Sequence, residues 1–222
     1  MSRPRRILQD EFPYHVCTRT NGRAFKFRKH TFKLFIKTLI DVVKKFDAKI
    51  EHFQLMSNHY HLKLRTPNAN LHQIMHHLNG QVAARFNRLM GVTGHLWEKR
   101  YHSTIISNDE YAQNCVVYLY NNVVRAGMCE TPEESEMLSS FEFYARGKKI
   151  EFIVTKDEVF LLLGDDAEER RRNFRAMFEK PLTPQMESSI RDLLHSHFCG
   201  PPEFITRMRD RYAAHLRLKR AA

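Results

Sequence analysis

Residues 50–65 read IEHFQLMSNHYHLKLR and predict two neighbouring strands joined by a tight turn. Ser57 and Asn58 separate the segments Ile50–Met56 and Tyr60–Arg65, and both are residue types typical of a hairpin turn. Pro67 follows the second segment, where a residue without a backbone N–H ends a strand. We therefore expect an antiparallel hairpin at the centre of a sheet.

Helices and further strands are expected on both sides of this hairpin. Apolar residues recur at helical spacing, with polar and basic residues between them, in Lys29–Phe46 and in Leu71–Met90. Strands are expected over Pro13–Arg19 and Leu96–Ile106, and polar capping residues then open a helix that runs from Ser107 to about Arg125. The order strand, helix, strand, strand, helix, strand, helix predicts an α+β fold, a ferredoxin-like antiparallel sheet with helices on one side.

The rest of the chain predicts a helical extension. The core domain is expected over residues 1–131, a polar linker or surface extension over 132–155, and a basic C-terminal extension over 156–222. The helices expected in that extension are Lys156–Leu163, Ala167–Glu179, Pro184–His197 and Pro202–Arg220.

The charge of the chain indicates which kind of partner it binds. Among 222 residues, 36 Lys and Arg stand against 25 Asp and Glu, a formal net charge of +11. This excess favours an anionic partner, and the aromatic content of 11% favours nucleic acid, whose unpaired bases stack on aromatic rings. By charge alone, a basic soluble enzyme fits equally well.

Other classes of protein are disfavoured. The four cysteines lie far apart and form no CxxC pair, which argues against a zinc ribbon and against a disulfide framework. No apolar run approaches the roughly 20 residues of a membrane span, and no signal peptide is evident. We therefore expect a cytoplasmic protein with no membrane partner.

His59 and His61 are the first candidates for chemistry. Side chains two apart on a strand point to the same face, so these two imidazoles lie side by side while Tyr60 points into the opposite layer. Two neutral imidazoles on a rigid strand form half of a divalent-metal site. A pair of surface or hydrogen-bonded histidines fits the same pattern. His72 and His76, one turn apart on a helix, lack a third ligand, and His195 and His197 are expected at the surface.

Tyr118 and Asn122 are the second pair of candidates. Residues four apart share a helix face, so the two side chains lie together, with Tyr111 and Arg125 on about the same side. This polar and aromatic face is suited to chemistry. A half-buried packing tyrosine explains the spacing as well.

Both motifs together resemble those of the single-tyrosine HUH transposases. More narrowly, the chain resembles the REP-associated tyrosine transposases, in the strand His59–His61 and in Tyr118 and Asn122 followed by Val124–Gly127. Val123 stands where this family usually has proline, which lets the helix continue. Further agreement in order and spacing covers nearly the whole chain: Arg3–Arg6 before Tyr14–Val16, Gly94–Tyr101, Leu138–Phe141, Leu163–Gly164 before Glu169–Arg171, and Gly200 before Phe204.

The resemblance implies a specific chemistry. Residues 1–131 would be an HUH catalytic domain, in which His59, His61 and Asn122 hold a divalent ion, Mg²⁺ or Mn²⁺, and Tyr118 is the nucleophile. The product would be a 5′-phosphotyrosine on single-stranded DNA at a REP-like hairpin, which makes the chain a nuclease and strand transferase, a transposase. Two alternatives stay open: a non-catalytic hairpin-binding protein derived from a transposase, and an enzyme that nicks without transposing.

The resemblance also implies a binding partner, a cellular location and an oligomeric state. The implied partner is single-stranded or hairpin DNA in a cytoplasmic, nucleoid-associated setting. A monomer is favoured, and a dimer that exchanges its tyrosine helices is the alternative. Side chains expected to contact DNA are Arg3, Arg5, Arg6, Arg85, Arg88, Lys99, Arg100 and Arg125.

Overall fold

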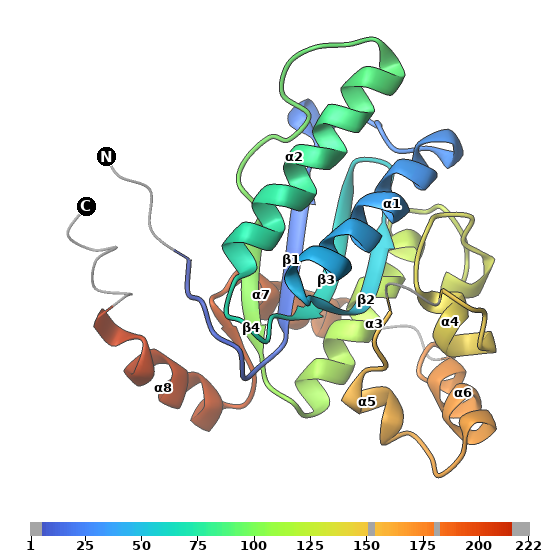
Figure 1. Cartoon of the computed structure of the whole chain (residues 1–222). Coiled ribbons are helices and arrows are strands. Elements are labelled where there is room, and N and C mark those ends of the chain that lie inside the picture. The colour runs from blue at the N-terminus through green and yellow to red at the C-terminus, as the bar shows by residue number, and fades with distance from the viewer. Residues whose placement is uncertain (1–5, 151–153, 180–182, 215–222) are drawn as a thin grey trace.

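A five-stranded sheet organises the computed structural model, which describes residues 6–150, 154–179 and 183–214 (Figure 1). The strand order is β2-β3-β1-β4-β5, and the first four strands are antiparallel to their neighbours while β5 is parallel to β4. The strands are β1 (Tyr14–Arg19), β2 (Lys49–Leu55), β3 (His59–Arg65), β4 (His102–Ile106) and β5 (Phe198–Cys199). The expected α+β class and the ferredoxin-like order of the first four strands are confirmed.

Two long helices cover one face of the sheet. They are α1 (Lys29–Phe46) and α2 (Leu71–Met90), which cross in front of the strands in Figure 1. Every second residue of β3, namely Tyr60, Leu62 and Leu64, is buried in the main hydrophobic core on this side. The intervening residues of β3 point to the opposite face. The expected hairpin thereby sends its apolar and its polar side chains into separate layers.

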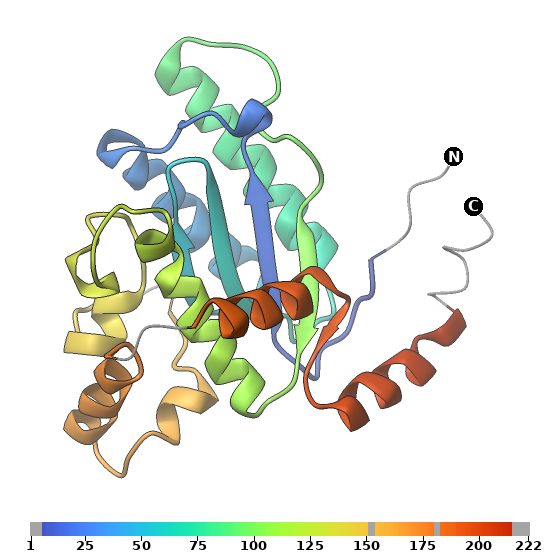
Figure 2. The same ribbon diagram turned by 180° about the vertical axis from the view of Figure 1, so that it is seen from behind.

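The opposite face is covered as well, which corrects the expected one-sided arrangement. Figure 2 shows α3 (Glu110–Arg125) and α7 (Pro184–His195) in front of the strands when the molecule is seen from behind. The continuation of the helix past Asn122 is confirmed, since α3 runs to Arg125. The end of α7 is tied to β4, because Thr104 Oγ1 donates a hydrogen bond of 2.6 Å to the carbonyl of Leu194.

The segment expected to be a linker or surface extension, residues 132–155, contains regular structure in its described part, residues 132–150 and 154–155. It contains α4 (Phe141–Arg146), whose aromatic residues pack with α3, α5 (Glu158–Leu161) and α6 (Ala167–Ala176). This second core is built mainly from rings, with Tyr144 stacked on Phe174 at a centroid distance of 5.4 Å. Its buried members are Val116, Leu119, Tyr120, Phe141, Tyr144, Ala145, Phe160 and Phe174.

Three other expectations need correction. The strand expected over Leu96–Ile106 begins only at His102, and Leu96 and Trp97 lie in the preceding loop with Leu96 buried. The strand β5 was not expected. The last helix, α8 (Pro202–Arg211), ends before the expected Arg220, and residues 215–222 lie outside the described part of the chain. In that described part, no helix is long and apolar enough to cross a membrane.

A buried charge network joins the extension to the sheet. It consists of Glu51, His52, Lys63, Arg65 and Asp157. Lys63 Nζ lies 2.5 Å from Glu51 Oε2 and 2.8 Å from Asp157 Oδ1, and its side chain is only 1% exposed. Asp157 follows the segment expected to be a linker, so this network fixes that segment against β2 and β3.

Candidate active site

His59 and His61 lie side by side on β3, on the face that α3 covers. Their ring centroids are 5.0 Å apart, with His61 buried and His59 partly exposed. The Nε2 atom of His61 is buried and has no hydrogen-bond partner among the described residues. A buried polar atom without a protein partner is rare, so this nitrogen is available to a ligand.

Both imidazoles are oriented through their other nitrogen. His61 Nδ1 lies 2.9 Å from His15 Nε2, and the two rings stack with centroids 5.1 Å apart. His59 Nδ1 lies 2.6 Å from Asn58 Oδ1, so the ring donates to this amide oxygen and keeps a lone pair on Nε2. Histidines that bind metals are usually held in this way. The expected pairing of His59 and His61 therefore has a supporting layer, His15 and Asn58.

Burial keeps these imidazoles neutral. Desolvation, followed by the charges of Arg19 and Arg125, lowers the pKa of His59 to about 4. Desolvation also lowers the pKa of His15 to about 3 and holds the pKa of His61 well below its ordinary value. Neutral imidazole is the form that binds a metal ion.

Tyr118 faces the histidine pair from α3 of the same chain. Its ring is perpendicular to the ring of His61, with centroids 6.1 Å apart, and the Arg125 guanidinium lies 4.9 Å from its ring centroid. Tyr118 is 5% exposed and packs in a small hydrophobic cluster with Leu194 of α7. The expected meeting of the strand motif and the helix motif is present in the structure.

Asn122 lies on the same helix, but its side chain is occupied. Its Nδ2 donates a hydrogen bond of 2.8 Å to the carbonyl of Tyr118, and its Oδ1 accepts one from Arg125 Nη2. The guanidinium uses one of the two lone pairs of this oxygen, and its positive charge opposes a cation beside it. The described residues include no cluster of three or more His, Cys, Asp or Glu side chains able to hold a metal ion. The two histidines fit a divalent ion, whereas Asn122 fits it best when Arg125 moves away.

A cavity of about 240 Å³ opens between His61 and Tyr118. Its walls carry a high density of positive charge, which suits a phosphodiester. The basic side chains that line it are Arg19, Arg23, Lys99 and Arg100. Arg19 and Arg23 were not among the residues expected to contact DNA, because an isolated arginine before a turn carries no sequence signal.

The histidines around the cavity are more numerous than the sequence indicated. His102 and His195 also line it, with their rings stacked at a centroid distance of 5.8 Å. His195 is exposed, as expected, yet it belongs to the wall of this cavity. Only the fold brings these residues to His61, because they come from β4 and α7.

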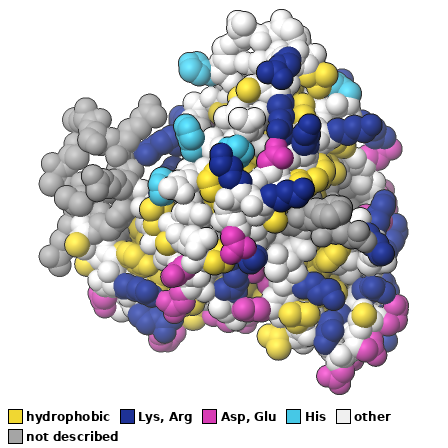
Figure 3. All heavy atoms as spheres, viewed as in Figure 1, with side chains coloured by type: hydrophobic (Ala, Val, Ile, Leu, Met, Phe, Trp, Pro, Cys, Tyr) yellow, Lys and Arg dark blue, Asp and Glu magenta, His cyan; other side chains and the backbone are white. Residues whose placement is uncertain are grey.

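The other residues expected to contact DNA lie apart from this cavity. Arg88 is exposed on α2, whereas Arg85 is paired with Asp41 at 2.5 Å and its charge is partly neutralised. Arg6 packs on the ring of Tyr101. Arg3 and Arg5 lie outside the described residues. Histidine and Lys or Arg side chains lie close together on the face formed by α1 and α2 (Figure 3).

Comparisons with known proteins concern the family and the fold of this chain. Residues 9–122 match the family model described as IS200-like transposase. The fold is similar to that of a REP-associated tyrosine transposase solved with a REP hairpin bound, with a TM-score of 0.58 and 18% identity over 75% of this chain and 93% of that chain. A candidate transposase from Deinococcus radiodurans gives a TM-score of 0.39 and 21% identity over 51% of this chain and 92% of the other. No curated protein matches the sequence.

Proposed function

Since the chain belongs to the family of IS200-like transposases, we propose that it cleaves and rejoins single-stranded DNA through Tyr118, with a divalent ion on His59 and His61. The observation that carries this proposal is the position of Tyr118 against His61, whose Nε2 is buried without a partner, in a cavity lined by arginine and lysine. A nucleophile, a metal-binding nitrogen and a phosphate-attracting surface then share one site.

His59 and His61 would hold the ion through their Nε2 atoms, and the amide oxygen of Asn122 is the third candidate ligand. Imidazole nitrogen with an amide oxygen suits Mn²⁺ as well as Mg²⁺. When bound, the ion supplies Lewis-acid polarisation of a non-bridging phosphate oxygen. His15 and Asn58 orient the two rings, and the guanidinium of Arg125 passes from Asn122 to the negative charge of the substrate.

The Tyr118 hydroxyl attacks phosphorus, and the bond between phosphorus and the 3′-oxygen breaks. The tyrosine proton leaves to solvent or to a neighbouring acceptor, and the departing oxygen takes up a proton to become a 3′-hydroxyl. The 5′ end of the DNA stays on Tyr118 Oη as a phosphodiester. Because one phosphodiester replaces another, a 3′-hydroxyl can reverse the step, and strand transfer needs no nucleotide triphosphate.

Hairpin DNA is the proposed substrate. The similar solved structure carries a REP hairpin, and the net charge of +11 favours a polyanion. Since Tyr118 meets the histidines of its own chain, we propose that a monomer carries out the reaction, in the cytoplasm at the nucleoid.

One observation favours a second candidate function, a hairpin-binding protein without turnover. Arg125 donates a hydrogen bond to Asn122 Oδ1, and Tyr118 is nearly buried in a hydrophobic cluster that includes Leu194. If these contacts persist on DNA, the third ligand and the nucleophile are both unavailable.

Metal removal separates the two functions. Incubation with labelled hairpin DNAs that carry unpaired flanks, in the presence of Mn²⁺ or Mg²⁺, is expected to give a covalent protein–DNA band on a denaturing gel. Excess EDTA is expected to abolish that band while leaving binding in a native gel. Binding without an adduct across a broad pool of hairpins would contradict the catalytic proposal and favour the second candidate.

His15 is expected to act on the metal through His61. Replacing His15 by Ala removes the partner of His61 Nδ1, and loss of such a partner typically weakens metal affinity by about 10- to 100-fold. The Mn²⁺ concentration that gives half-maximal adduct should rise accordingly, and saturating Mn²⁺ should restore the yield. His30→Ala, an exposed substitution on α1, serves as the control. An unchanged Mn²⁺ midpoint in His15→Ala would show that His15 does not position His61.

A further inference from the structure

His195 lies on the wall of the cavity beside Tyr118, although it comes from the C-terminal extension. It is the last residue of α7, and α7 contributes Ile190 and Leu194 to the hydrophobic cluster that contains Tyr118. Tyr118, Leu194 and His195 all line the cavity of about 240 Å³. The match to the family model ends at residue 122, so α7 lies outside it. A residue of the extension therefore reaches the site proposed for the scissile phosphate.

The backbone on both sides of His195 is fixed to β4. Thr104 Oγ1 lies 2.6 Å from the carbonyl oxygen of Leu194 and 2.8 Å from that of Ser196. His102 Nε2 donates a hydrogen bond of 2.9 Å to the same carbonyl of Leu194. The rings of His102 and His195 stack with centroids 5.8 Å apart. His195 is thus exposed to solvent and yet held in place, as a group that takes part in catalysis must be.

One hydrogen bond decides which nitrogen of His195 can accept a proton. His195 Nδ1 lies 2.7 Å from the carbonyl oxygen of Arg191. A carbonyl oxygen only accepts, so Nδ1 carries the hydrogen and, in the neutral ring, Nε2 keeps the lone pair. His195 therefore offers a base at Nε2.

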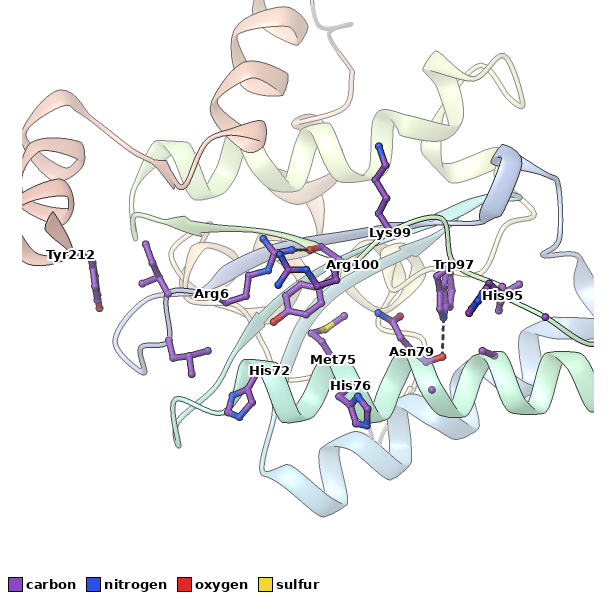
Figure 4. A pocket seen from close by; sticks show the side chains of 17 residues that line it. Arg6, His72, Met75, His76, Asn79, His95, Trp97, Lys99, Arg100 and Tyr212 are labelled. Atoms are coloured by element: carbon purple, nitrogen blue, oxygen red, sulfur yellow. Dashed lines mark hydrogen bonds between the residues drawn. The ribbon is translucent and has the colours of Figure 1, made fainter. Parts of the chain in front are cut away.

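The positive charges of the cavity suit the phosphate rather than the proton. Lys99 and Arg100 belong to a loop that lines both this cavity and a larger one, of about 900 Å³, beside α2 (Figure 4). Lys99 extends away from α2 in the figure. Ammonium and guanidinium groups present donors and no acceptor. The basic side chains of the cavity can therefore bind phosphate oxygens but cannot take a proton from Tyr118.

Few proton acceptors remain on the described walls of the cavity. His61 Nε2 is the atom proposed to bind the divalent ion, and His61 Nδ1 is paired with His15 at 2.9 Å. Glu98 also lines the cavity, but carboxylates are in general weaker bases than imidazole. Imidazole both takes up and releases a proton near neutral pH. The imidazole of His195 is then the group best suited to this task.

We propose that His195 is the catalytic base that takes the proton of Tyr118. This inference rests on the proposed function, because it concerns the same attack on phosphorus. As Tyr118 Oη bonds to phosphorus, its proton passes to the lone pair of His195 Nε2. The bond between phosphorus and the 3′-oxygen breaks with its electron pair on that oxygen, which takes a proton from solvent. When a 3′-hydroxyl attacks the phosphotyrosine, the imidazolium returns its proton to Tyr118 Oη and the hydroxyl loses its own to solvent.

The place of His195 in the fold assigns it to the nucleophile rather than to the leaving oxygen. The attacking and leaving oxygens lie on opposite sides of phosphorus in an in-line displacement. Leu194, the residue before His195, packs in the cluster of Tyr118. His195 therefore lies on the side of the attacking oxygen.

His195→Ala is expected to slow formation of the covalent adduct by about 100-fold or more at saturating Mn²⁺ and hairpin DNA, the usual contribution of a general base. The hairpin concentration that gives the half-maximal rate should stay within about twofold, because the charges that attract phosphate remain. Free imidazole should restore part of the rate, since the substitution opens an exposed place that a small molecule can enter. His30→Ala, an exposed histidine substitution on α1, should react at the natural rate with and without imidazole.

Three results of this experiment would overturn the proposal. The first is a natural rate of adduct formation in His195→Ala. The second is a slow variant that imidazole does not rescue, because a merely structural loss is not repaired by a free base. The third is a rate that falls in Glu98→Gln and not in His195→Ala, which would place the base at Glu98.

A substrate with sulfur in place of the bridging 3′-oxygen separates the two proton transfers. A 3′-thiolate leaves without taking up a proton, so a group that acts only on the leaving atom becomes dispensable. His195→Ala should slow cleavage of the oxygen and sulfur substrates by a similar factor. A defect that disappears with sulfur would assign His195 to the leaving oxygen and overturn the proposal. The absence of any adduct with the natural chain would refute the proposed function, and this role of His195 with it, whereas a natural rate in His195→Ala would refute the role of His195 alone.

Discussion

Tyr118→Phe is expected to lower the yield of covalent protein–DNA adduct by at least about a thousandfold, the scale of loss seen when a nucleophile is removed. The substitution deletes the Oη atom that attacks phosphorus. It preserves the ring, which lies 6.1 Å from the ring of His61 and beneath the Arg125 guanidinium. Hairpin binding in a native gel should therefore stay within about twofold of the natural chain, because the substitution leaves the positive charges that attract phosphate unchanged.

Tyr111→Phe is the matched control for this experiment. Tyr111 lies on the same helix and packs partly buried in the same small cluster as Tyr118, so its substitution removes one hydroxyl from similar surroundings. Its adduct yield should equal that of the natural chain. An adduct that persists in Tyr118→Phe would place the nucleophile elsewhere and refute the assignment.

The sequence predicted the centre of this molecule well, because the signals there are local. The period of two in Tyr60, Leu62 and Leu64 and the helical spacing of apolar residues in Lys29–Phe46 both report which face is buried, and both elements formed as expected. The pairing of His59 and His61 has the same origin, since alternation along a strand decides it.

The misassigned segments lack such a local signal. Leu96 and Trp97 are apolar because they close a loop over α2 rather than because they form a strand, and a short apolar run fits both structures. Strand β5 has two residues, too few for any period, and it forms only where β4 offers a parallel edge. In residues 132–155 the rings of Phe141, Phe143 and Tyr144 form a run too short to show a helical period, and the short α4 is stabilised by contacts with distant rings.

The supporting residues of the candidate site were missed for a related reason. His15 reaches His61 across the β1–β3 pairing, in which His15 lies opposite Lys63 and Cys17 opposite His61. Nothing within β1 specifies that register. The hydrogen bond between Arg125 and Asn122 Oδ1 was likewise not predictable from the sequence. Side chains three residues apart on a helix can contact each other, but each has several rotamers and only some of them form the contact.

Lys63→Met is expected to cost about 3–5 kcal/mol of unfolding free energy, because it removes one partner from the buried charge network. The variant leaves Glu51 and Asp157 buried without the ammonium that lies 2.5 and 2.8 Å from their oxygens. Urea unfolding at neutral pH measures the loss. Lys49→Met is the control, since the Lys49–Asp47 pair is exposed and such pairs contribute about 0–1 kcal/mol. The double variant Lys63→Met, Asp157→Asn should recover part of the loss, because it also removes one stranded charge.

The pH dependence of this loss follows from the two pKa shifts. Burial alone would raise the pKa of Asp157, but Lys63 and the hydrogen bond from His52 lower it below its ordinary value. Burial by itself would lower the pKa of Lys63. The negative charges of Glu51 and Asp157 outweigh this effect and raise the pKa of the ammonium above its ordinary value. A carboxylate whose pKa is lowered on folding stabilises the folded state at pH values above its ordinary pKa of about 4. A lysine whose pKa is raised on folding stabilises the folded state at pH values below its ordinary pKa of about 10.

The difference in unfolding free energy between the natural chain and Lys63→Met should therefore be greatest between pH values of about 4 and about 10. It should shrink as acid protonates Asp157 and as alkali deprotonates Lys63. A difference that is constant across the whole range would show that packing of the lysine stem, and not its charge, holds residues 154–158 against the sheet.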